Sequence, residues 1–296
     1  FRHDAVQIEY IKMSLNCRDL QRRRRGAEME RPRLSLNTHE LGSIPRARHA
    51  ARAAGKLDKA AARRDAASWR RLQVDATGWA DRTVCVTGED RRELEAQGGR
   101  NLESVPLGMD LEAVAGDWTP PGTDRYLFVG SFAHRPNRLA ADFLLDRVWP
   151  LVRRERPEAE LVLAGRGFDD YLAGRPAPEG VTAPGFVPDL GPLFRSSRLF
   201  LAPLPEGGGI KIKILEAFAR GIPVVTSPVG AEGITTESDR ACWITDCDDR
   251  FAVTVLAAAA DTDEAAARGA AGRRLMEEKY SWAAITDRLT GIYEGA

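Results

Sequence analysis

Gly-Gly-Gly-Ile-Lys-Ile-Lys-Ile-Leu-Glu-Ala-Phe-Ala-Arg-Gly-Ile-Pro, residues 207–223, is the most informative segment of the sequence. Three glycines form a flexible loop ahead of a helix that we predict from Ile210 to Arg220. Gly221 then provides a left-handed cap, and Pro223 stops the helix. A flexible loop that opens a helix gathers free backbone N–H groups, so the segment predicts an anion site at the helix start.

Two lysines stand in the first turn of this predicted helix. The chain has 6 lysines against 37 arginines, yet Lys211 and Lys213 lie two residues apart. A cation there opposes the helix dipole, whereas a bound phosphate would favour both the dipole and the lysines. The alternative makes Lys213 and Glu216 a surface pair worth ~0.2–0.5 kcal/mol and the glycines an ordinary loop. Three successive glycines argue against it, because each costs ~0.5–1 kcal/mol relative to alanine.

Helical spacing gives this segment two faces. The predicted buried stripe consists of Ile210, Ile214, Ala217 and Phe218. The separate polar face consists of Lys213, Glu216 and Arg220. Glu216 is therefore expected one turn from the anion site.

A second glycine turn follows a predicted strand at residues 128–137, Phe-Val-Gly-Ser-Phe-Ala-His-Arg-Pro-Asn. Gly130 allows close backbone approach at the end of the strand, where ligand phosphates or sugars bind in α/β proteins. The polar groups offered there are Ser131, His134, Arg135 and Asn137. Turns of this kind occur in every α/β protein, so this one gains weight only from the glycine-lysine segment.

The rest of the chain alternates apolar runs with helical patterns. In the first half we predict strands at Ala5–Tyr10, Leu34–Leu36 and Thr83–Thr87, and one long helical stretch over Ala47–Val74. In the second half we predict strands at Tyr126–Val129, Glu160–Ala164, Leu199–Ala202, Pro223–Thr226 and Cys242–Thr245. This alternation implies parallel sheets with right-handed crossovers, an α/β doubly wound architecture.

Length and composition set the domain count and the compartment. With 296 residues the chain is long enough for two domains, and its apolar runs are too short to span a membrane. The best linker is Asp117–Thr123, so we predict domains at 1–112 and 113–296, with the last helix able to cross back to the first domain. The four cysteines lack metal-site spacing, which favours free thiols in a reducing compartment. A start at Phe1, close to a strand-like run, leads us to expect further sequence upstream.

The formal net charge of zero hides an asymmetry. Residues 1–72 hold 18 Lys and Arg against 8 Asp and Glu, a net charge of +10, and the remainder carries −10. The basic cluster of Arg22–Arg25, with Arg18, Arg31 and Arg33, is expected to face water, anionic lipid headgroups or nucleic acid. Nucleic acid is the weakest of the three, because no aromatic residue is interleaved to stack bases. Dinucleotide and ATP-binding glycine fingerprints are both absent from the sequence, which argues against hydride chemistry and ATP hydrolysis.

Four segments together resemble the donor-binding half of group 1 (family 4) glycosyltransferases, which have the GT-B fold. They are Phe128–Asn137, Gly185–Val187, Gly207–Pro223 and Ser227–Gly233. The pattern Gly-x-Gly-x-x-x-Lys-x-Leu-Glu-Ala begins at Gly207, and the resemblance is dense over residues 125–245. Upstream the resemblance is looser and covers Val6–Tyr10, Thr38–Glu40 and Val105–Asp110. The first strands of the acceptor-binding domain and its glycine-rich opening loop find no counterpart here.

The resemblance implies an α/β fold of two Rossmann-like domains, the first of them incomplete, that hold a nucleotide-sugar and transfer its sugar with retention. Lys211 and Lys213 would neutralise the leaving diphosphate, and Glu216 would bind the ribose hydroxyls. Phe186 or Val187 would meet the base through main-chain groups. Other donor-binding residues implied are Gly130, Ser131, Asn137, Gly207, Gly208, Gly209 and Ile210. No metal and no further cofactor is implied, because the lysines and the helix dipole supply the positive charge.

The family pattern is broken at one position. Many relatives carry a glutamate eight residues before Glu216, where this chain has Gly208, and the nearest acid is Glu206. A subgroup with Gly-x-Gly here lacks that glutamate as well, so the departure bears on how the donor sugar is recognised. On the acceptor side the candidates are His39 and Glu40, for which a capping pair at a helix start is the alternative.

The resemblance therefore leads us to expect a cytoplasmic, metal-independent, retaining hexosyltransferase of polysaccharide biosynthesis, with a saccharide, lipid-linked or small-molecule hydroxyl acceptor. Peripheral contact with the inner face of the membrane is compatible with the basic first half. The alternative is a non-catalytic module of the same fold that binds a nucleotide or a sugar phosphate. Epimerisation on a GT-B fold is a more distant option.

Overall fold

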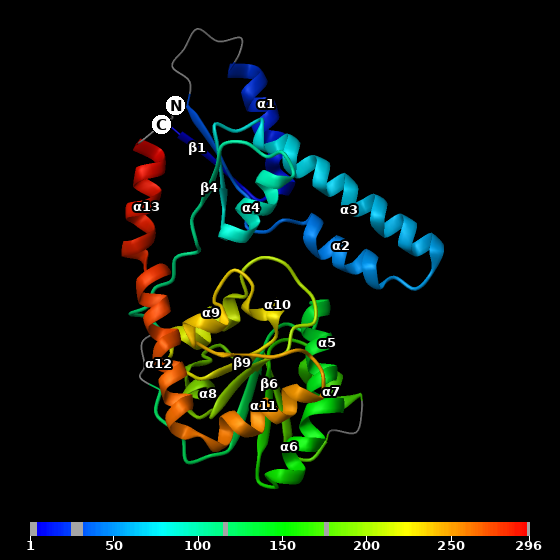
Figure 1. Cartoon of the computed structure of the whole chain (residues 1–296), viewed down its shortest axis with the longest axis vertical. Coiled ribbons are helices and arrows are strands. Elements are labelled where there is room, and N and C mark those ends of the chain that lie inside the picture. Colours follow the sequence, from blue (N-terminus) through cyan, green and yellow to red (C-terminus); the bar gives the residue numbers. More distant parts are fainter. Residues whose placement is uncertain (1–4, 25–31, 115–117, 175–177, 295–296) are drawn as a thin grey trace. The chain divides into compact units, whose positions relative to one another are not determined.

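The chain is described by a computed structural model over residues 5–24, 32–114, 118–174 and 178–294 (Figure 1). It divides into two compact units. The first comprises residues up to Gly108, the short segment Glu206–Ile210 and the residues from Ala283 onward. The second comprises Met109–Pro205 and Lys211–Trp282. The glycine loop and the helix after it thus fall in different units.

The first unit is built on a parallel sheet with the order β1-β2-β3-β4. Its strands are β1 (Ala5–Glu9), β2 (Arg33–Asn37), β3 (Arg82–Cys85) and β4 (Leu102–Ser104). The connecting helices are η1 (Ile11–Met13), α1 (Ser14–Arg24), α2 (Ser43–Arg52), α3 (Lys56–Thr77) and α4 (Gly88–Ala96). The C-terminal helix α13 (Trp282–Glu294) contributes Ile285 to a small core with Val84 and Val105. Every strand connection contains a helix, as parallel pairing requires.

Two of the predictions for this unit are wrong in detail. The single long helix over Ala47–Val74 is two helices, α2 and α3, because Ala53 and Gly55 both have extended backbones. Figure 1 shows the pair as a hairpin that extends from the sheet. Strand β4 escaped prediction because its three residues are only partly buried and it pairs with β3 alone. Of the basic cluster, Arg25 and Arg31 lie outside the described residues.

The second unit is built on a six-stranded parallel sheet with the order β10-β9-β8-β5-β6-β7. The strands are β5 (Arg125–Val129), β6 (Glu160–Ala164), β7 (Val181–Gly185), β8 (Leu199–Ala202), β9 (Val224–Thr226) and β10 (Trp243–Ile244). The helices are α5 (Arg135–Phe143), η2 (Leu144–Val148), α6 (Trp149–Glu155), α7 (Phe168–Ala173), α8 (Gly191–Arg195), α9 (Ile212–Ala219), α10 (Pro228–Ala231), η3 (Glu237–Asp239), α11 (Asp249–Ala260) and α12 (Thr262–Lys279). The predicted strands of this half are confirmed apart from end residues.

Strands of this sheet are apolar on both faces, as expected for a parallel sheet covered by helices. One face packs Tyr126, Phe128 and Leu161 with α5, α6 and α11 in a single hydrophobic core. On the other face the ring of Phe200 stacks on Phe194 of α8, with 5.6 Å between centroids. Strand β7 was missed because it lies at the sheet edge and contains a proline, which edge strands tolerate.

The predicted linker is held against the second unit. Asp117 lies outside the described residues, and residues 118–123 have no helix or strand. The indole N–H of Trp118 donates to the carbonyl oxygen of Ser197 at 2.9 Å, and the Thr123 hydroxyl donates to that of Ser196 at 2.8 Å. Among the described helices none is long and apolar enough to cross a membrane. Nor do the described His, Cys, Asp and Glu side chains form a group of three that could hold a metal ion.

Candidate nucleotide-sugar site

Strand order places the site of the second unit. The chain runs β5, β6, β7 in one direction and then returns to lay β8 on the opposite side of β5. Helices and loops therefore diverge at the carboxyl ends of β5 and β8, which is where open α/β sheets bind their ligands. The turn at Gly130 follows β5, and the segment that leads to α9 follows β8. Two stretches of sequence some 80 residues apart are thereby brought to adjacent strand ends, where this topology is expected to form a ligand crevice.

Helix α9 is shorter than predicted. It begins at Ile212 with Lys211 as its N-cap, so Ile210 lies in the preceding loop and is not part of the buried stripe. Its end is as predicted, with Gly221 at φ +67° in the left-handed region. Ile214, Ala217 and Phe218 are fully buried. The apolar stripe therefore packs α9 against the sheet. The N-terminus of the helix lies at the carboxyl ends of the strands.

Lys213 is the central cation of the crevice. Its ammonium group donates to Oδ1 of Asn137 at 2.5 Å and lies 4.6 Å from the centroid of the Phe128 ring. Asn137 is buried, and its amide nitrogen donates to the carbonyl oxygen of Ser131 at 2.9 Å. Both ends of the amide are thus engaged, which fixes Asn137 and through it the lysine. Asn137, which the sequence predicted as a donor-binding residue, is thus the hydrogen-bond partner of Lys213.

Gly130 makes room for that arrangement. A Cβ atom on Gly130 would lie 2.6 Å from Nδ2 of Asn137 and 2.9 Å from Nζ of Lys213. No side chain fits there without moving both groups. Ser131, next along the turn, is exposed and contributes its carbonyl oxygen, and His134 and Arg135 are also exposed.

Burial lowers the pKa of Lys213 from its ordinary value to about 7, although the nearby Glu216 carboxylate works in the opposite direction. The ammonium form is thus poorly stabilised while the crevice holds no anion. A diphosphate beside Nζ would favour the charged form and raise the pKa again. We therefore expect Lys213 to gain its proton together with an anionic ligand.

This arrangement predicts proton-linked binding. Above pH 7 the free site carries an uncharged Lys213, so diphosphate binding takes up a proton, and affinity falls with rising pH by at most about tenfold per unit. Calorimetric titrations in buffers of different ionisation enthalpy measure that uptake. The Lys213→Met variant provides the control and should lose it; equal uptake by wild type and variant would contradict the assignment.

The lowered pKa of Lys213 also makes the free energy of unfolding depend on pH. Between pH 7 and about 10 the unfolded chain keeps the Lys213 proton whereas the folded chain does not. Stability from this group therefore rises with pH across that window.

Lys211 has a different environment from Lys213. Its side chain is buried, and its ammonium group lies 3.8 Å from a carboxylate oxygen of Glu232, just after α10. Helix α10 starts at Ser227, whose hydroxyl accepts from the Gly230 N–H and donates to the carbonyl oxygen of Leu204. Glu232 was not among the predicted site residues, although it lies within a segment that carries the family resemblance. The charge of Lys211 is thus shared with a carboxylate of the same unit.

Glu216 lies one turn into α9, as predicted, and is partly exposed. Its charge favours the protonated forms of both Lys213 and Arg220. Arg220 lies over the Phe194 ring at 4.6 Å and donates to the carbonyl oxygen of Glu216. The carboxylate has no hydrogen bond within the described part of the chain, so its oxygens remain available as acceptors for hydroxyl groups.

Phe186 and Val187 follow β7 at the far side of β6 from the Gly130 turn. The Phe186 side chain is 61% exposed, and the guanidinium group of Arg166 lies 4.9 Å from its ring centroid. Val187 is partly buried. Carboxyl ends two strands apart are separated by about 10 Å, a distance that a nucleotide can span. The predicted base-binding residues are therefore on the same edge of the sheet as Lys213.

The glycine loop belongs to the first unit, where it lies against the turn after β2. A Cβ atom on Gly209 would lie 3.2 Å from the carbonyl oxygen of His39 and 3.2 Å from Cβ of Glu40. Gly208 has Pro45 as its near neighbour, and the guanidinium group of Arg48 donates to the carbonyl oxygen of Gly207. Two predicted groups, the loop and the acceptor-side pair, are thus neighbours. Glu206, the acidic residue nearest to the position where many relatives carry a glutamate, is buried in the same loop.

The capping interpretation of His39 and Glu40 is wrong. Helix α2 has Gly42 as its N-cap and no side-chain capping bond. His39 instead contacts the Glu9 carboxylate at 2.5 Å, whereas Glu40 is exposed. Sequence reasoning missed Glu9 because the pair is 30 residues apart and only the pairing of β1 with β2 brings its members together.

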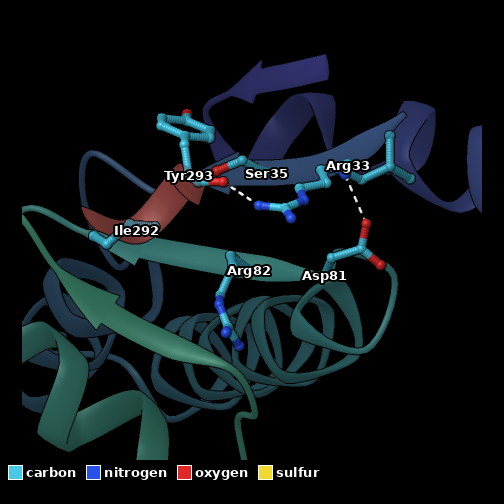
Figure 2. Close-up of a pocket in the computed structure, with 7 residues that line it drawn as sticks. Arg33, Ser35, Asp81, Arg82, Ile292 and Tyr293 are labelled. Atoms are coloured by element: carbon cyan, nitrogen blue, oxygen red, sulfur yellow. Dashed lines mark hydrogen bonds between the residues drawn. The ribbon is translucent and has the colours of Figure 1, made fainter. Parts of the chain in front are cut away.

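A separate pocket of about 230 Å³ lies at the opposite edge of the first sheet, where β2 and β3 begin (Figure 2). Arg33 donates to the carbonyl oxygen of Tyr293, and the Leu34 N–H donates to Asp81 at 2.7 Å. None of the predicted site residues lines it. We therefore assign no function to this pocket.

The two Rossmann-like parallel sheets of this chain, with their helical crossovers, have the α/β fold of GT-B glycosyltransferases. Two solved structures have a similar fold. Anabaena Alr3699/HepE in complex with UDP has a TM-score of 0.74 and 14% identity, covering 98% of this chain and 79% of that one. Sucrose-phosphate synthase from Thermosynechococcus elongatus has a TM-score of 0.75 and 17% identity, covering 99% and 73%. At these identities the likeness establishes the fold alone.

The sequence comparisons point to the same class. Residues 123–261 match the family model described as Glycosyl transferases group 1. The phosphatidyl-myo-inositol mannosyltransferase of Mycobacterium tuberculosis (strain ATCC 25618 / H37Rv) is 28% identical over 226 residues, covering 71% of this chain. The match spans 58% of the length of that curated relative. The similarity to this family thus lies in the second unit and extends, at lower density, over most of the chain.

Proposed function

We propose that the chain is a retaining, metal-independent hexosyltransferase that moves a sugar from a nucleotide-diphosphate sugar to a hydroxyl acceptor. The observation that carries the proposal is the Lys213 site, where a desolvated lysine, fixed by Asn137 over Phe128, stands at the switch point of a doubly wound sheet. Such a lysine favours an anionic ligand, and a diphosphate leaving group is the anion that sugar transfer releases.

We assign the following roles to the residues of the second unit. Lys213 stabilises negative charge as the diphosphate departs, and Lys211 is a second cation. Glu216 accepts hydrogen bonds from the ribose hydroxyls. Phe186 and Val187 meet the base. The lysines and the helix dipole supply the charge that a metal ion provides in other transferases.

We propose that the turn that carries His39 and Glu40 binds the acceptor. The acceptor hydroxyl belongs to a saccharide, a lipid-linked sugar or a small molecule. Two observations support a lipid-linked or membrane-borne acceptor. Residues 1–72 carry a net charge of +10, which favours anionic headgroups. The name of the mycobacterial relative also indicates that it acts on a phosphatidyl lipid. We place the chain in the cytoplasm with peripheral contact at the inner membrane face, in polysaccharide or glycolipid synthesis.

A transfer assay tests the proposal. The 296-residue chain is incubated with UDP-, GDP-, ADP- and dTDP-hexoses and a panel of polyol and lipid acceptors, and nucleoside diphosphate release is followed with and without chelator. We expect one donor to be consumed, undiminished by the chelator, and proton NMR to show the anomeric configuration retained in the product. Inversion would contradict the retaining mechanism. Tight nucleotide binding without consumption of any donor would favour the non-catalytic module.

A further inference from the structure

Three residues gather at the carboxyl ends of β1 and β2 in the first unit. Glu9 ends β1, Tyr10 follows it, and His39 lies two residues after β2. Glu9 and Asn37 are register partners in the parallel ladder, so the two strand ends are level. The carboxyl edge of a parallel sheet is where ligands bind. Of the three residues, only His39 was recognisable from the sequence.

The Glu9 carboxylate is held from several sides. One oxygen contacts Nε2 of His39 at 2.5 Å, and the other accepts from the Asn37 amide at 3.2 Å and from the Gln7 amide. Partial burial alone would raise the pKa of Glu9, but the hydrogen bonds from Gln7, His39 and Asn37 outweigh it and leave the pKa below its ordinary value. The carboxylate is therefore ionised at neutral pH and acts only as an acceptor.

The Glu9 carboxylate, which lies next to Nε2 of His39, determines the tautomer of the imidazole ring. The neutral ring must carry its proton on Nε2 to donate to Glu9, which leaves the Nδ1 lone pair free to accept. Within the described part of the chain Nδ1 has no hydrogen-bond partner, and the ring is 27% exposed. His39 thus presents a single acceptor atom in a fixed orientation.

The backbone at this place is unusual on both strands. Tyr10 has φ +68° and His39 φ +53°, two of the four non-glycine residues with positive φ in the described chain. Their rings stack at 4.2 Å with 22° between planes. A bulky residue in the left-handed region is an outlier, and such strain collects at ligand sites, where surrounding contacts hold it. The Tyr10 N–H donates to the Asn37 carbonyl oxygen at 2.8 Å and supplies one such contact.

We propose that Glu9 is a positioning residue that holds His39 as the Nε2–H tautomer, so that Nδ1 accepts a hydrogen bond from a hydroxyl group of the acceptor. Within the first unit the turn that carries His39 lies against the glycine loop, since a Cβ atom on Gly209 would lie 3.2 Å from the His39 carbonyl oxygen. The hydroxyl half of the proposal rests on the proposed transferase function. The tautomer half stands on the geometry of the first unit alone.

The variant Glu9→Gln tests both halves. A glutamine amide can present either its oxygen or its nitrogen to Nε2, so the ring loses its fixed tautomer. We expect kcat/KM for the acceptor to fall about 10- to 100-fold, with donor KM and melting temperature little changed. Glu9→Asp, which keeps the charge, should recover part of the loss. Glu95→Gln, an exposed glutamate of α4, is the matched control and should behave as wild type.

A spectroscopic measurement separates the two halves. Long-range proton–nitrogen NMR of ring-labelled protein distinguishes the four histidines, with His39 assigned by its loss in His39→Gln. We expect wild-type His39 to be protonated at Nε2 above pH 7 and the Glu9→Gln protein to show a mixture. An Nδ1–H tautomer in wild type would overturn the positioning role. The expected tautomer with unchanged acceptor kinetics in Glu9→Gln would overturn the hydroxyl contact, and failure of every donor in the transfer assay would overturn the proposed function itself.

Discussion

Replacing Lys213 by methionine is expected to lower kcat/KM for the nucleotide-sugar about 10²- to 10³-fold. A preorganised group that meets developing charge is worth about 3–4 kcal/mol in the transition state. Lys211 should compensate only in part for the loss, because its ammonium group lies 3.8 Å from the Glu232 carboxylate. Methionine retains the apolar stem over Phe128 while removing the charge. Steady-state kinetics with the preferred donor measures the loss.

The melting temperature is the companion measurement for Lys213→Met. Because burial destabilises the charged lysine, we expect the variant to melt at the same temperature as wild type or above it. Lys279→Met, at the exposed end of α12, is the matched control and should change neither quantity. Loss of activity together with a large drop in melting temperature would mean that Lys213 supports the fold rather than the reaction.

Gly165→Ala is expected to destabilise the second unit strongly. Gly165 follows β6 at φ +135°, a region that residues with side chains rarely adopt. A Cβ atom there would lie 1.7 Å from the carbonyl oxygen of Gly130, so the backbone of the Gly130 turn has to move. Strain and displacement together should cost more than about 3 kcal/mol, a loss of roughly 10 °C in melting temperature or a failure to fold.

The control for Gly165→Ala is Gly122→Ala. Gly122 has negative φ and no atom within 4 Å of a Cβ added there, so alanine should be neutral or slightly stabilising. Thermal unfolding followed by circular dichroism compares the two. If Gly165→Ala melted within about 2 °C of wild type, the close approach between the Gly130 and Gly165 turns would be wrong.

Much of the second unit could be predicted from its sequence because its signals are local. Apolar runs such as Leu199–Ala202 are buried on both faces, and Gly221 ends α9 in the left-handed conformation that its position predicts. The failures also have local causes. In the first unit, Ala53 and Gly55 interrupt a long alanine-rich stretch whose periodicity predicts a single helix. In the second unit, β7 was missed because the strand contains a proline.

The site was predictable only in part, because its pairings depend on topology. Periodicity placed Lys213 and Asn137 at the starts of two helices, but only the strand order β8-β5 shows that 76 residues of separation become a 2.5 Å contact. The same holds for Glu9 and His39. Residue type and local turn thus identified both members of the first pair and one member of the second, but the contacts themselves required the fold.

The central claim, that the crevice beside Lys213 binds a nucleoside diphosphate, is tested most directly by calorimetric titration of the 296-residue chain with UDP, GDP, ADP and dTDP at pH 7. We predict that one of them binds to wild type with a 1:1 stoichiometry and at least tenfold more weakly to Lys213→Met. If none of the four binds wild type, or if the variant binds the preferred nucleotide as tightly as wild type does, the claim is wrong.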